Sequence, residues 1–218
     1  MNDKREAARA AAAYVEEGMV VGLGSGSTVS LMIAEIAGKA KNITVIPASS
    51  QTYLECVNAG LTLTTLDRHP QPDIYLDSFD QVDRARNMIK GGGAALMREK
   101  VLATASRKRI FAGTYSKVVD RLNRPVPLEV LPFALGYVVS LLREKQASPR
   151  LRDSDAKNGP TVTDNGNYIL DVDFGEIEEP SVLEAWLRKV PGVLENGLFV
   201  GLADRVLIAY GGGFVEEL

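Results

Sequence analysis

The chain has 218 residues, of which 45% are hydrophobic and 24% are charged. This length suits one large domain, or one domain with a smaller second one, and the composition supports a folded core. The net charge of −3 argues against a general nucleic-acid-binding protein, which is usually basic. No apolar run reaches the ~18 residues that cross a bilayer, and the charged N-terminus lacks the apolar stretch of a signal peptide. We therefore expect a cytoplasmic protein that does not bind membranes.

Cysteine and histidine are almost absent from the chain. Cys56 and His69 are the single residues of each type. No internal disulfide can form, and a zinc site rich in cysteine or histidine is excluded. We interpret Cys56 as a packed residue of an amphipathic helix and His69 as part of a polar turn, so neither is expected to be catalytic.

Helices and strands are expected to alternate through the first 120 residues. Asp3 is expected to cap a first helix, which stops at Gly18. The other expected helices cover 29–36, 51–59 and 94–100, and the expected strands cover 19–23, 43–46, 61–65, 74–76 and 110–112. This alternation predicts an open α/β sheet that binds ligands at the carboxyl ends of its strands.

The pattern changes after Arg124, where several prolines interrupt the chain. We expect a helix over 133–143, a polar stretch over 144–160, a hairpin of strands 161–163 and 168–172 around the turn 164–167, a helix over 180–189, and a strand over 206–209 that returns to the main sheet. These elements indicate a small α+β module. The expected domains are residues 1–125 plus 201–218, and residues 126–200.

A loop rich in glycine and serine, Gly22–Thr28, follows the first expected strand and begins the next helix. Its glycines allow backbone N–H groups to approach an anion, and the helix N-terminus adds about half a positive charge. The loop lacks the lysine of a P-loop, and its G-x-G-x-G spacing does not match the dinucleotide-binding fingerprint. A small phosphorylated ligand is the better fit, and a plain tight turn is the alternative.

An acidic segment, Asp77–Asp83, directly follows the strand over 74–76. Two carboxylates that lie close together can differ in pKa, so that one stays charged while the other holds a proton. A solvated acidic turn, in which Asp80 or Asp83 caps a helix, is the commoner structure for such a segment. A magnesium site is a third alternative.

A second glycine-rich loop begins at Lys90 and continues through Gly91–Gly93. Its open backbone donors and the lysine at its edge are suited to stabilising an oxyanion. Glu99 lies on the following helix, where a half-buried carboxylate can act as a base. The alternatives are a flexible connection and a surface carboxylate between Arg98 and Lys100.

One further lysine, Lys117, follows the strand over 110–112. Placed at the same edge of the sheet, it can reach a phosphate as a point charge. The alternative is a solvated lysine, which is the usual state of this residue.

Taken together, these segments resemble ribose-5-phosphate isomerase type A over nearly the whole chain, from Lys4 to about Ala209. The resemblance rests on GLGSGSTV, LDSFDQVD, KGGGAALMREKVLA, SK, RPVPLEVLPFA, GPTVTDNGNYILD and VPGVLENGLF. The segments KGGGAALMREK and VTDNGNYILD are the most specific. The resemblance implies an α/β fold, with a Rossmann-like open-sheet domain and a smaller ferredoxin-like α+β domain, and a homodimer or homotetramer.

The resemblance also implies an aldose–ketose isomerase. It would interconvert D-ribose 5-phosphate and D-ribulose 5-phosphate through an enediolate, in the non-oxidative branch of the pentose phosphate pathway, without a metal or organic cofactor. Glu99 would move a proton between C1 and C2, Lys90 would stabilise the oxyanion, and Asp77 and Asp80 would contact the sugar oxygens. The residues implied to bind the sugar phosphate are Lys4, Ser25, Gly26, Ser27, Thr28, Gly91, Gly92, Gly93 and Lys117.

The acidic segment departs from the family pattern Asp-Gly-Ala-Asp-Glu. Ser78, Phe79 and Gln81 replace the glycine, the alanine and the glutamate. Phe79 adds bulk beside the expected sugar site, and Ser78 loses the access of glycine to positive φ. Two alternatives therefore stay open: a non-catalytic sugar-phosphate sensor on the same fold, and an isomerase of another phosphorylated sugar.

Overall fold

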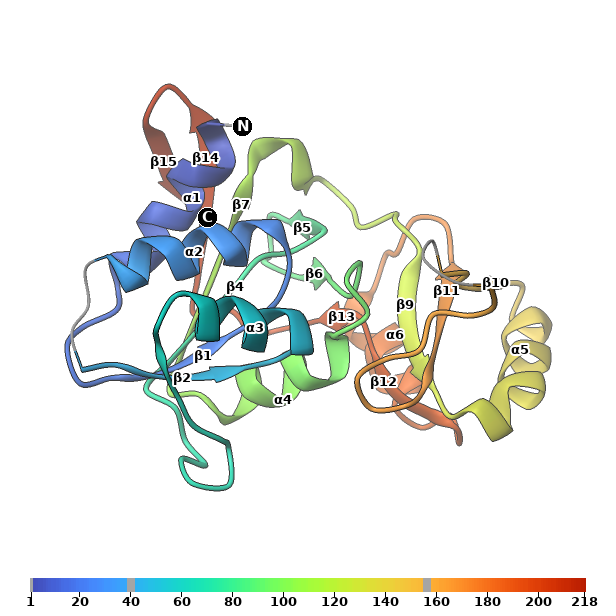
Figure 1. Cartoon of the computed structure of the whole chain (residues 1–218). Helices are drawn as coiled ribbons and strands as arrows, with labels where there is room; N and C mark the ends of the chain where they lie inside the picture. The colour runs from blue at the N-terminus through green and yellow to red at the C-terminus, as the bar shows by residue number, and fades with distance from the viewer. Residues whose placement is uncertain (1, 39–41, 155–157) are drawn as a thin grey trace. The chain divides into compact units, whose positions relative to one another are not determined.

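A computed structural model describes residues 2–38, 42–154 and 158–218 (Figure 1). The polar stretch predicted over 144–160 includes residues 155–157, and the predicted first domain includes residues 1 and 39–41, which lie outside the described residues. The chain divides into two compact units. The first unit consists of the residues up to Phe79, Arg98–Val118 and Gly201–Leu218, and the second unit consists of Asp80–Met97 and Val119–Val200. Residues 80–97 and 119–125, predicted in the first domain, are part of the second unit here.

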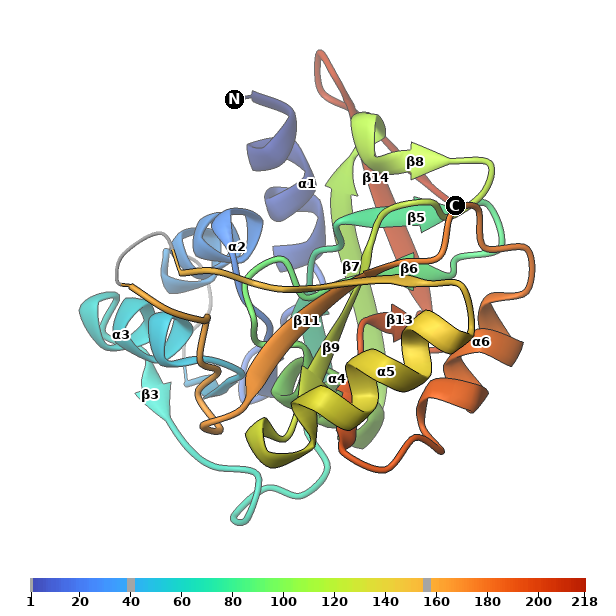
Figure 2. The same ribbon diagram turned by 90° about the vertical axis from the view of Figure 1, so that its right-hand side faces the viewer.

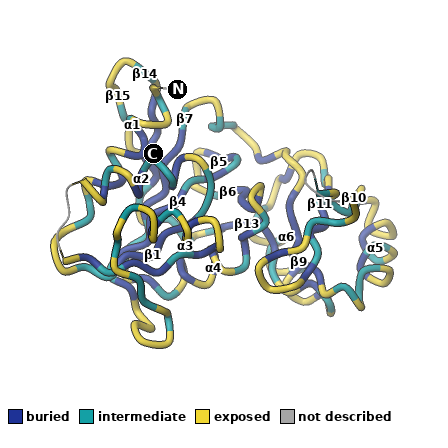
Figure 3. Tube along the Cα trace, viewed as in Figure 1, coloured by how far each residue is buried: buried dark blue, intermediate teal, exposed yellow. Residues whose placement is uncertain are grey.

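The first unit contains a seven-stranded sheet, with the order β15 (Phe214–Glu217), β14 (Arg205–Gly211), β7 (Lys108–Thr114), β4 (Ile74–Asp77), β1 (Val20–Leu23), β2 (Thr44–Pro47) and β3 (Thr62–Leu63). The strands pair in parallel, except for the antiparallel edge strand β15. Parallel strands are buried on both faces, which explains their continuous apolar runs. Figure 3 shows these central strands as buried segments.

The helices associated with this sheet are α1 (Asn2–Ala12), α2 (Ser27–Ala37), α3 (Ser50–Asn58) and α4 (Leu96–Ala105). The alanine face of α1 shares a core with α2 and with the strands β1, β4, β7 and β14. Because alanine side chains are short, the backbone of α1 can approach the neighbouring elements closely. The parallel pairing of β14 with β7 confirms that the last predicted strand returns to the main sheet.

The predicted cap and end of the first helix are wrong. Asp3 lies inside the first turn of α1, where a negative charge is favourable at the positive end of the helix dipole. The helix ends at Ala12 rather than near Gly18. The N–H groups of Tyr14 and Val15 donate to carbonyls three residues earlier, which tightens the chain into a turn.

The second unit contains, in chain order, β9 (Val126–Val130), α5 (Leu135–Glu144), β10 (Ser148–Leu151), β11 (Tyr168–Asp173), α6 (Pro180–Leu187) and β12 (Val193–Asn196). The strands form an antiparallel sheet in the order β10-β11-β9-β12. This is the βαββαβ connectivity of a ferredoxin-like fold. Figure 2 shows α5 crossing this sheet, and α5 and α6 share its core. The predicted fold class is therefore confirmed.

A small sheet contains β13 (Leu198–Phe199), β6 (Met88–Ile89), β5 (Gln81–Asp83) and β8 (Val118–Val119), in that order. These short strands were not predicted. They correct the alternative in which Asp83 caps a helix, because Asp83 ends β5. Its carboxylate accepts hydrogen bonds from Asn87 N and Nδ2 at 2.8 and 2.9 Å, which closes the turn between β5 and β6.

The hairpin predicted around 164–167 is only half correct. The strand β11 forms, but 161–163 is not a strand and makes a single bridge, from Val162 to Tyr168. Polar side chains of this segment instead turn toward β9, where Glu129 is fully buried. The donors to Glu129 Oε1 are Thr163 Oγ1, Asn165 Nδ2 and Asn167 Nδ2, at 2.8–2.9 Å.

A partly exposed ion pair joins the residue before β14 to β7. Asp204 Oδ2 accepts hydrogen bonds from Arg109 N and Nε at 2.7 and 2.9 Å, and Oδ1 accepts from Nη2 at 2.8 Å. The side-chain hydrogen bond from Arg109 is the main cause that lowers the pKa of Asp204 below its ordinary value.

We predict that Asp204→Asn destabilises the protein at neutral pH by at most about 1 kcal/mol, because the pair is partly exposed. The folded-state pKa of Asp204 is depressed, so its stabilisation is complete above about pH 4 and is lost as the pH falls through the folded-state value. Urea unfolding should show a difference from wild type at neutral pH that shrinks in acid. Asp120→Asn, at an exposed carboxylate, is the control. The prediction would be contradicted if Asp204→Asn lowered the free energy of unfolding by the same amount at neutral and at acid pH.

Candidate active site

The first glycine-rich loop connects β1 to α2 at the carboxyl end of β1. Gly26 has a φ of 93°, a left-handed backbone that glycine adopts without strain. It places no side chain over the N-terminus of α2, where backbone N–H groups lack intrahelical partners. Thr28 is buried, whereas Ser27 is exposed. The loop therefore presents serine hydroxyls and helix N–H groups together.

Neighbouring elements hold this loop in place. Thr52 Oγ1, on α3, donates to the carbonyl of Gly24 at 2.7 Å, and Gly24 N donates to Leu76 O on β4 at 3.0 Å. Lys4, exposed on α1, donates from Nζ to Ser27 Oγ at 3.1 Å. The fold thus brings a cation from the first helix to the predicted anion loop. Thr52 was not predicted as a site residue, because its partner Gly24 lies in another loop of the chain.

Glu99 is buried beside the same loop. It lies in the first turn of α4 and is 2% exposed, and Ser25 Oγ donates a hydrogen bond to its Oε1. The alternative of a surface carboxylate between Arg98 and Lys100 is therefore wrong. All of these contacts lie within the first unit.

Asp77, at the end of β4, is also buried within the first unit. Its Oδ2 accepts a hydrogen bond from Tyr75 Oη at 2.5 Å, and its Oδ1 accepts from Ser78 N at 2.6 Å. A Cβ at position 24 would lie 1.9 Å from Asp77 Cγ. Glycine at position 24 therefore lets the carboxylate pack against the loop backbone, and a solvated acidic turn is the wrong description of Asp77.

Tyr75 is a member of this group that the sequence analysis missed. Burial is the main cause that raises the pKa of Tyr75 well above the ordinary value of 10. The negative charges of Asp77 and Glu99 raise it further. Its hydroxyl therefore stays protonated and acts as the donor to Asp77. The available signal was a tyrosine within an apolar strand, because a buried tyrosine hydroxyl usually has a hydrogen-bond partner.

Phe79 packs into the interior of the first unit. Its ring is 1% exposed, and a Cβ at Gly113 on β7 would lie 2.5 Å from Phe79 Cζ. Lys117, in the 3₁₀ turn η1 (Tyr115–Lys117), donates from Nζ to the carbonyl of Phe79 and lies 5.7 Å from the ring centroid. Gly113 on β7 thus leaves room for the ring of Phe79, which is larger than the alanine in the family pattern.

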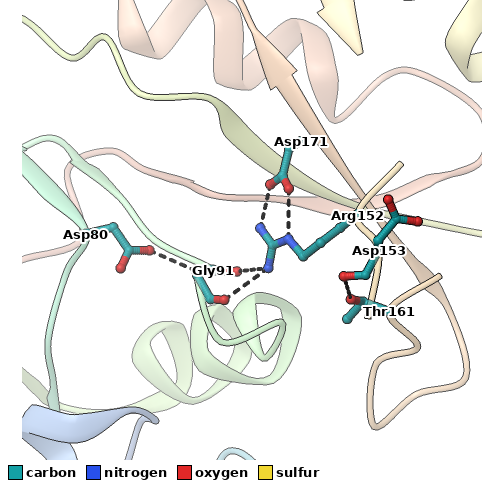
Figure 4. Close-up of polar contacts among 7 residues, drawn as sticks. Asp80, Gly91, Arg152, Asp153, Thr161 and Asp171 are labelled. Carbon is teal, nitrogen blue, oxygen red and sulfur yellow. Dashed lines mark hydrogen bonds and ion pairs between the residues drawn. The ribbon is translucent and has the colours of Figure 1, made fainter. Parts of the chain in front are cut away.

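Asp80 and the second glycine-rich loop belong to the second unit. Asp80 N donates to Ile89 O at 2.9 Å, and Asp80 Oδ2 accepts from Gly92 N at 2.8 Å (Figure 4). Gly91 is buried and has a φ of 109°, whereas Gly92 and Gly93 are exposed. The loop is held by specific hydrogen bonds, so the alternative of a flexible connection is wrong.

Lys90 is buried, with 3% of its surface exposed. Its backbone N–H donates to Gly197 O at 2.9 Å, and its Nζ lies 5.4 Å from the centroid of the Phe199 ring. A Cβ at position 197 would lie 2.3 Å from Lys90 O, so glycine is required there. Gly197 therefore lies against both the N–H and the carbonyl of Lys90.

Among the described residues, no group of three or more histidine, cysteine, aspartate or glutamate side chains is arranged to hold a metal ion. Cys56 is buried, as predicted, and burial raises the pKa of its thiol to about 11. Within the described part of the chain, no helix is long and apolar enough to cross a membrane.

Comparison with known proteins identifies relatives along nearly the whole chain. The family model for ribose 5-phosphate isomerase A (phosphoriboisomerase A) matches residues 44–213, and a model for the DeoR C-terminal sensor domain matches residues 1–63. Ribose-5-phosphate isomerase A of Methanosarcina acetivorans is 42% identical over 93% of this chain and 88% of its own length. The same enzyme of a Synechococcus strain is 45% identical over 94% and 91%.

Solved structures also match nearly the whole chain. A D-ribose-5-phosphate isomerase in complex with phospho-erythronic acid superposes with a TM-score of 0.95 at 36% identity, covering 99% of this chain and 97% of the other. Ribose 5-phosphate isomerase A of Methanocaldococcus jannaschii superposes with a TM-score of 0.93 at 33% identity, with the same coverage. The chain belongs to the ribose 5-phosphate isomerase A family.

Proposed function

We propose that this protein interconverts D-ribose 5-phosphate and D-ribulose 5-phosphate. The observation that carries the proposal is the buried carboxylate of Glu99, hydrogen-bonded to Ser25 of the loop that is suited to bind phosphate. A sensor needs the anion loop but has no use for a buried base beside it. The phosphorylated sugar acid bound to the similar solved structure supports a phosphorylated sugar as the ligand.

The substrate phosphate is proposed to bind at Ser25–Thr28. The N-terminus of α2 and the Lys4 ammonium near Ser27 both favour an anion there. Lys117, from the same unit, is proposed to supply a second positive charge. A phosphate bound in this way holds a small sugar in place while its other end reacts.

Glu99 is proposed to transfer the proton in the open-chain sugar. Its carboxylate takes the proton from C2 of the aldose, and the electron pair forms the C1=C2 bond of an enediolate. The carbonyl electrons of C1 move onto O1, which takes up the hydroxyl proton of O2. The same carboxyl group returns its proton to C1, and the oxygen on C2 becomes the carbonyl of the ketose. The hydrogen bond from Ser25 to Oε1 orients the carboxylate for both steps.

The remaining roles follow from the family resemblance. We propose that Asp77 and Asp80 contact the sugar oxygens, that Lys90 stabilises the oxyanion of the enediolate, and that Gly91–Gly93 contribute backbone donors. Oxyanion donors of this kind typically contribute about 3 kcal/mol to the transition state. The chemistry calls for no metal or organic cofactor.

A cytoplasmic homodimer or homotetramer is proposed from the same resemblance. An exposed aromatic surface on the first unit supports self-association. Tyr115 and Tyr210 stack with their centroids 4.7 Å apart, and Phe214 lies 5.5 Å from Tyr210. All three are exposed, and grouped exposed aromatic residues are typical of interaction surfaces.

We predict that Glu99→Gln lowers kcat by about 10²–10⁴-fold, because the amide cannot take the proton. Binding of ribose 5-phosphate, measured by calorimetry, should persist. A coupled assay of ribulose 5-phosphate formation, with the exposed Glu144→Gln as control, measures the loss. Undiminished turnover in Glu99→Gln would refute its role, and tight binding without turnover in the wild type would favour the sensor.

We predict that Lys117→Ala chiefly raises KM, by about tenfold, because a hydrogen bond to a charged group is worth roughly 1.5–3 kcal/mol. The kcat should change less, since this lysine is assigned to the phosphate rather than to the reacting carbons. Initial-rate kinetics, with the exposed Lys145→Ala as control, separate the two effects. An unchanged KM would argue against a phosphate contact.

A further inference from the structure

An arginine of the second unit holds the loop that contains the proposed oxyanion donors. Arg152 directly follows β10, and its guanidinium reaches the loop that begins at Lys90 (Figure 4). Arg152 was not among the site residues predicted from the sequence. Its contacts lie entirely within the second unit.

Asp171, on β11, fixes the orientation of this guanidinium. Arg152 Nε donates to Asp171 Oδ2 at 2.8 Å, and Nη2 donates to Oδ1. The two side chains are 17% and 18% exposed, so this is a mostly desolvated, two-pronged pair rather than a surface contact. The backbone of Arg152 is fixed as well, because its N–H donates to Ile169 O and its carbonyl accepts from Thr161 N.

The third nitrogen of Arg152 contacts the loop. Nη1 donates to Gly91 O at 2.9 Å and to Gly92 O at 3.1 Å. Asp80 contacts the loop at a different group, since its Oδ2 accepts from Gly92 N at 2.8 Å. The peptide group between Gly91 and Gly92 is thus held at its carbonyl by a cation and at its N–H by a carboxylate.

The directions of these two carbonyls also set the direction of the Gly93 N–H group. In a trans peptide the C=O and N–H bonds point to opposite sides. The Gly91–Gly92 peptide follows this rule, with its carbonyl toward Arg152 and its N–H toward Asp80. The carbonyl of Gly92 also faces Arg152, so the N–H of Gly93 points to the side away from the guanidinium. Arg152 therefore favours, together with the turn bond from Ala94 N to Gly91 O, one side of the loop for the backbone donors.

We propose that Arg152, oriented by Asp171, is a positioning residue that holds the Lys90–Gly93 loop in the form required for isomerisation. The inference rests on the proposed function of that loop. A lysine cannot replace Arg152, because a single ammonium group cannot bind Asp171 in two places and also bind both carbonyls. Loss of the contact leaves the Gly91–Gly92 peptide held by Ala94 N, which donates to Gly91 O at 3.0 Å, and by Asp80. The loop can then shift, and displaced catalytic groups lose rate rather than affinity.

Arg152→Lys is the decisive variant, with Arg152→Ala and Asp171→Asn beside it. We expect kcat to fall by up to about 10²-fold in Arg152→Lys, as for other small displacements of catalytic groups, with KM changed less than about threefold. Amide hydrogen exchange of the peptide that covers residues 90–95 should become faster. Arg121→Ala, which removes exposed pairs to Glu176 and Glu178 in the same unit, is the control and should change neither quantity.

A double-mutant cycle with Lys90→Ala tests whether Arg152 acts through the loop. If it does, Arg152→Lys should add little further loss of kcat in the Lys90→Ala background. Where Lys90→Ala itself lowers kcat, full additivity of the two losses would overturn the proposal, and so would unchanged kcat and exchange in Arg152→Lys. Unchanged kcat in Lys90→Ala would instead refute the role of Lys90, while faster exchange in Arg152→Lys would still show that the arginine holds the loop.

Discussion

The removal of Glu99 from water beside a glycine-rich loop is the constraint on which the site in the first unit depends. A buried carboxylate is costly unless hydrogen bonds compensate for lost hydration. Ser25 supplies one such bond to Glu99, and the hydroxyl of Tyr75 and the N–H of Ser78 supply two to Asp77. The raised pKa of Tyr75 keeps that hydroxyl protonated beside both acids. These donors therefore offset part of the hydration that the two acids lose on burial.

Glycines allow the backbone and the functional side chains to come this close. Gly24 leaves room for the carboxylate of Asp77, Gly113 for the ring of Phe79, and Gly197 for the carbonyl of Lys90. A methyl group at any of these positions would overlap its neighbour. The two glycine-rich loops therefore have different physical roles: the first exposes a helix N-terminus, whereas the second is held at its peptide groups by Arg152 and Asp80.

Hydrophobic patterning predicted the alternation of helices and strands, because each buried strand of a parallel sheet is a short apolar run. The loop over Gly22–Thr28 and the helix that carries Glu99 were also predictable from local signals. Contacts between distant residues were not. Arg152 lies 61 residues from Gly91, and no spacing in the chain links them. The strand expected over 161–163 failed for the same reason, because Thr163 and the asparagines of the following turn bind Glu129, more than thirty residues away.

A crystal structure of the protein with ribose 5-phosphate bound tests the central claim most directly. The account predicts phosphate oxygens within hydrogen-bond distance, about 3 Å, of the N–H groups at the start of α2, with the carboxylate of Glu99 against C1 and C2 of the open-chain sugar. A sugar bound with C1 and C2 away from Glu99, or a phosphate bound elsewhere than at Ser25–Thr28, would contradict the account.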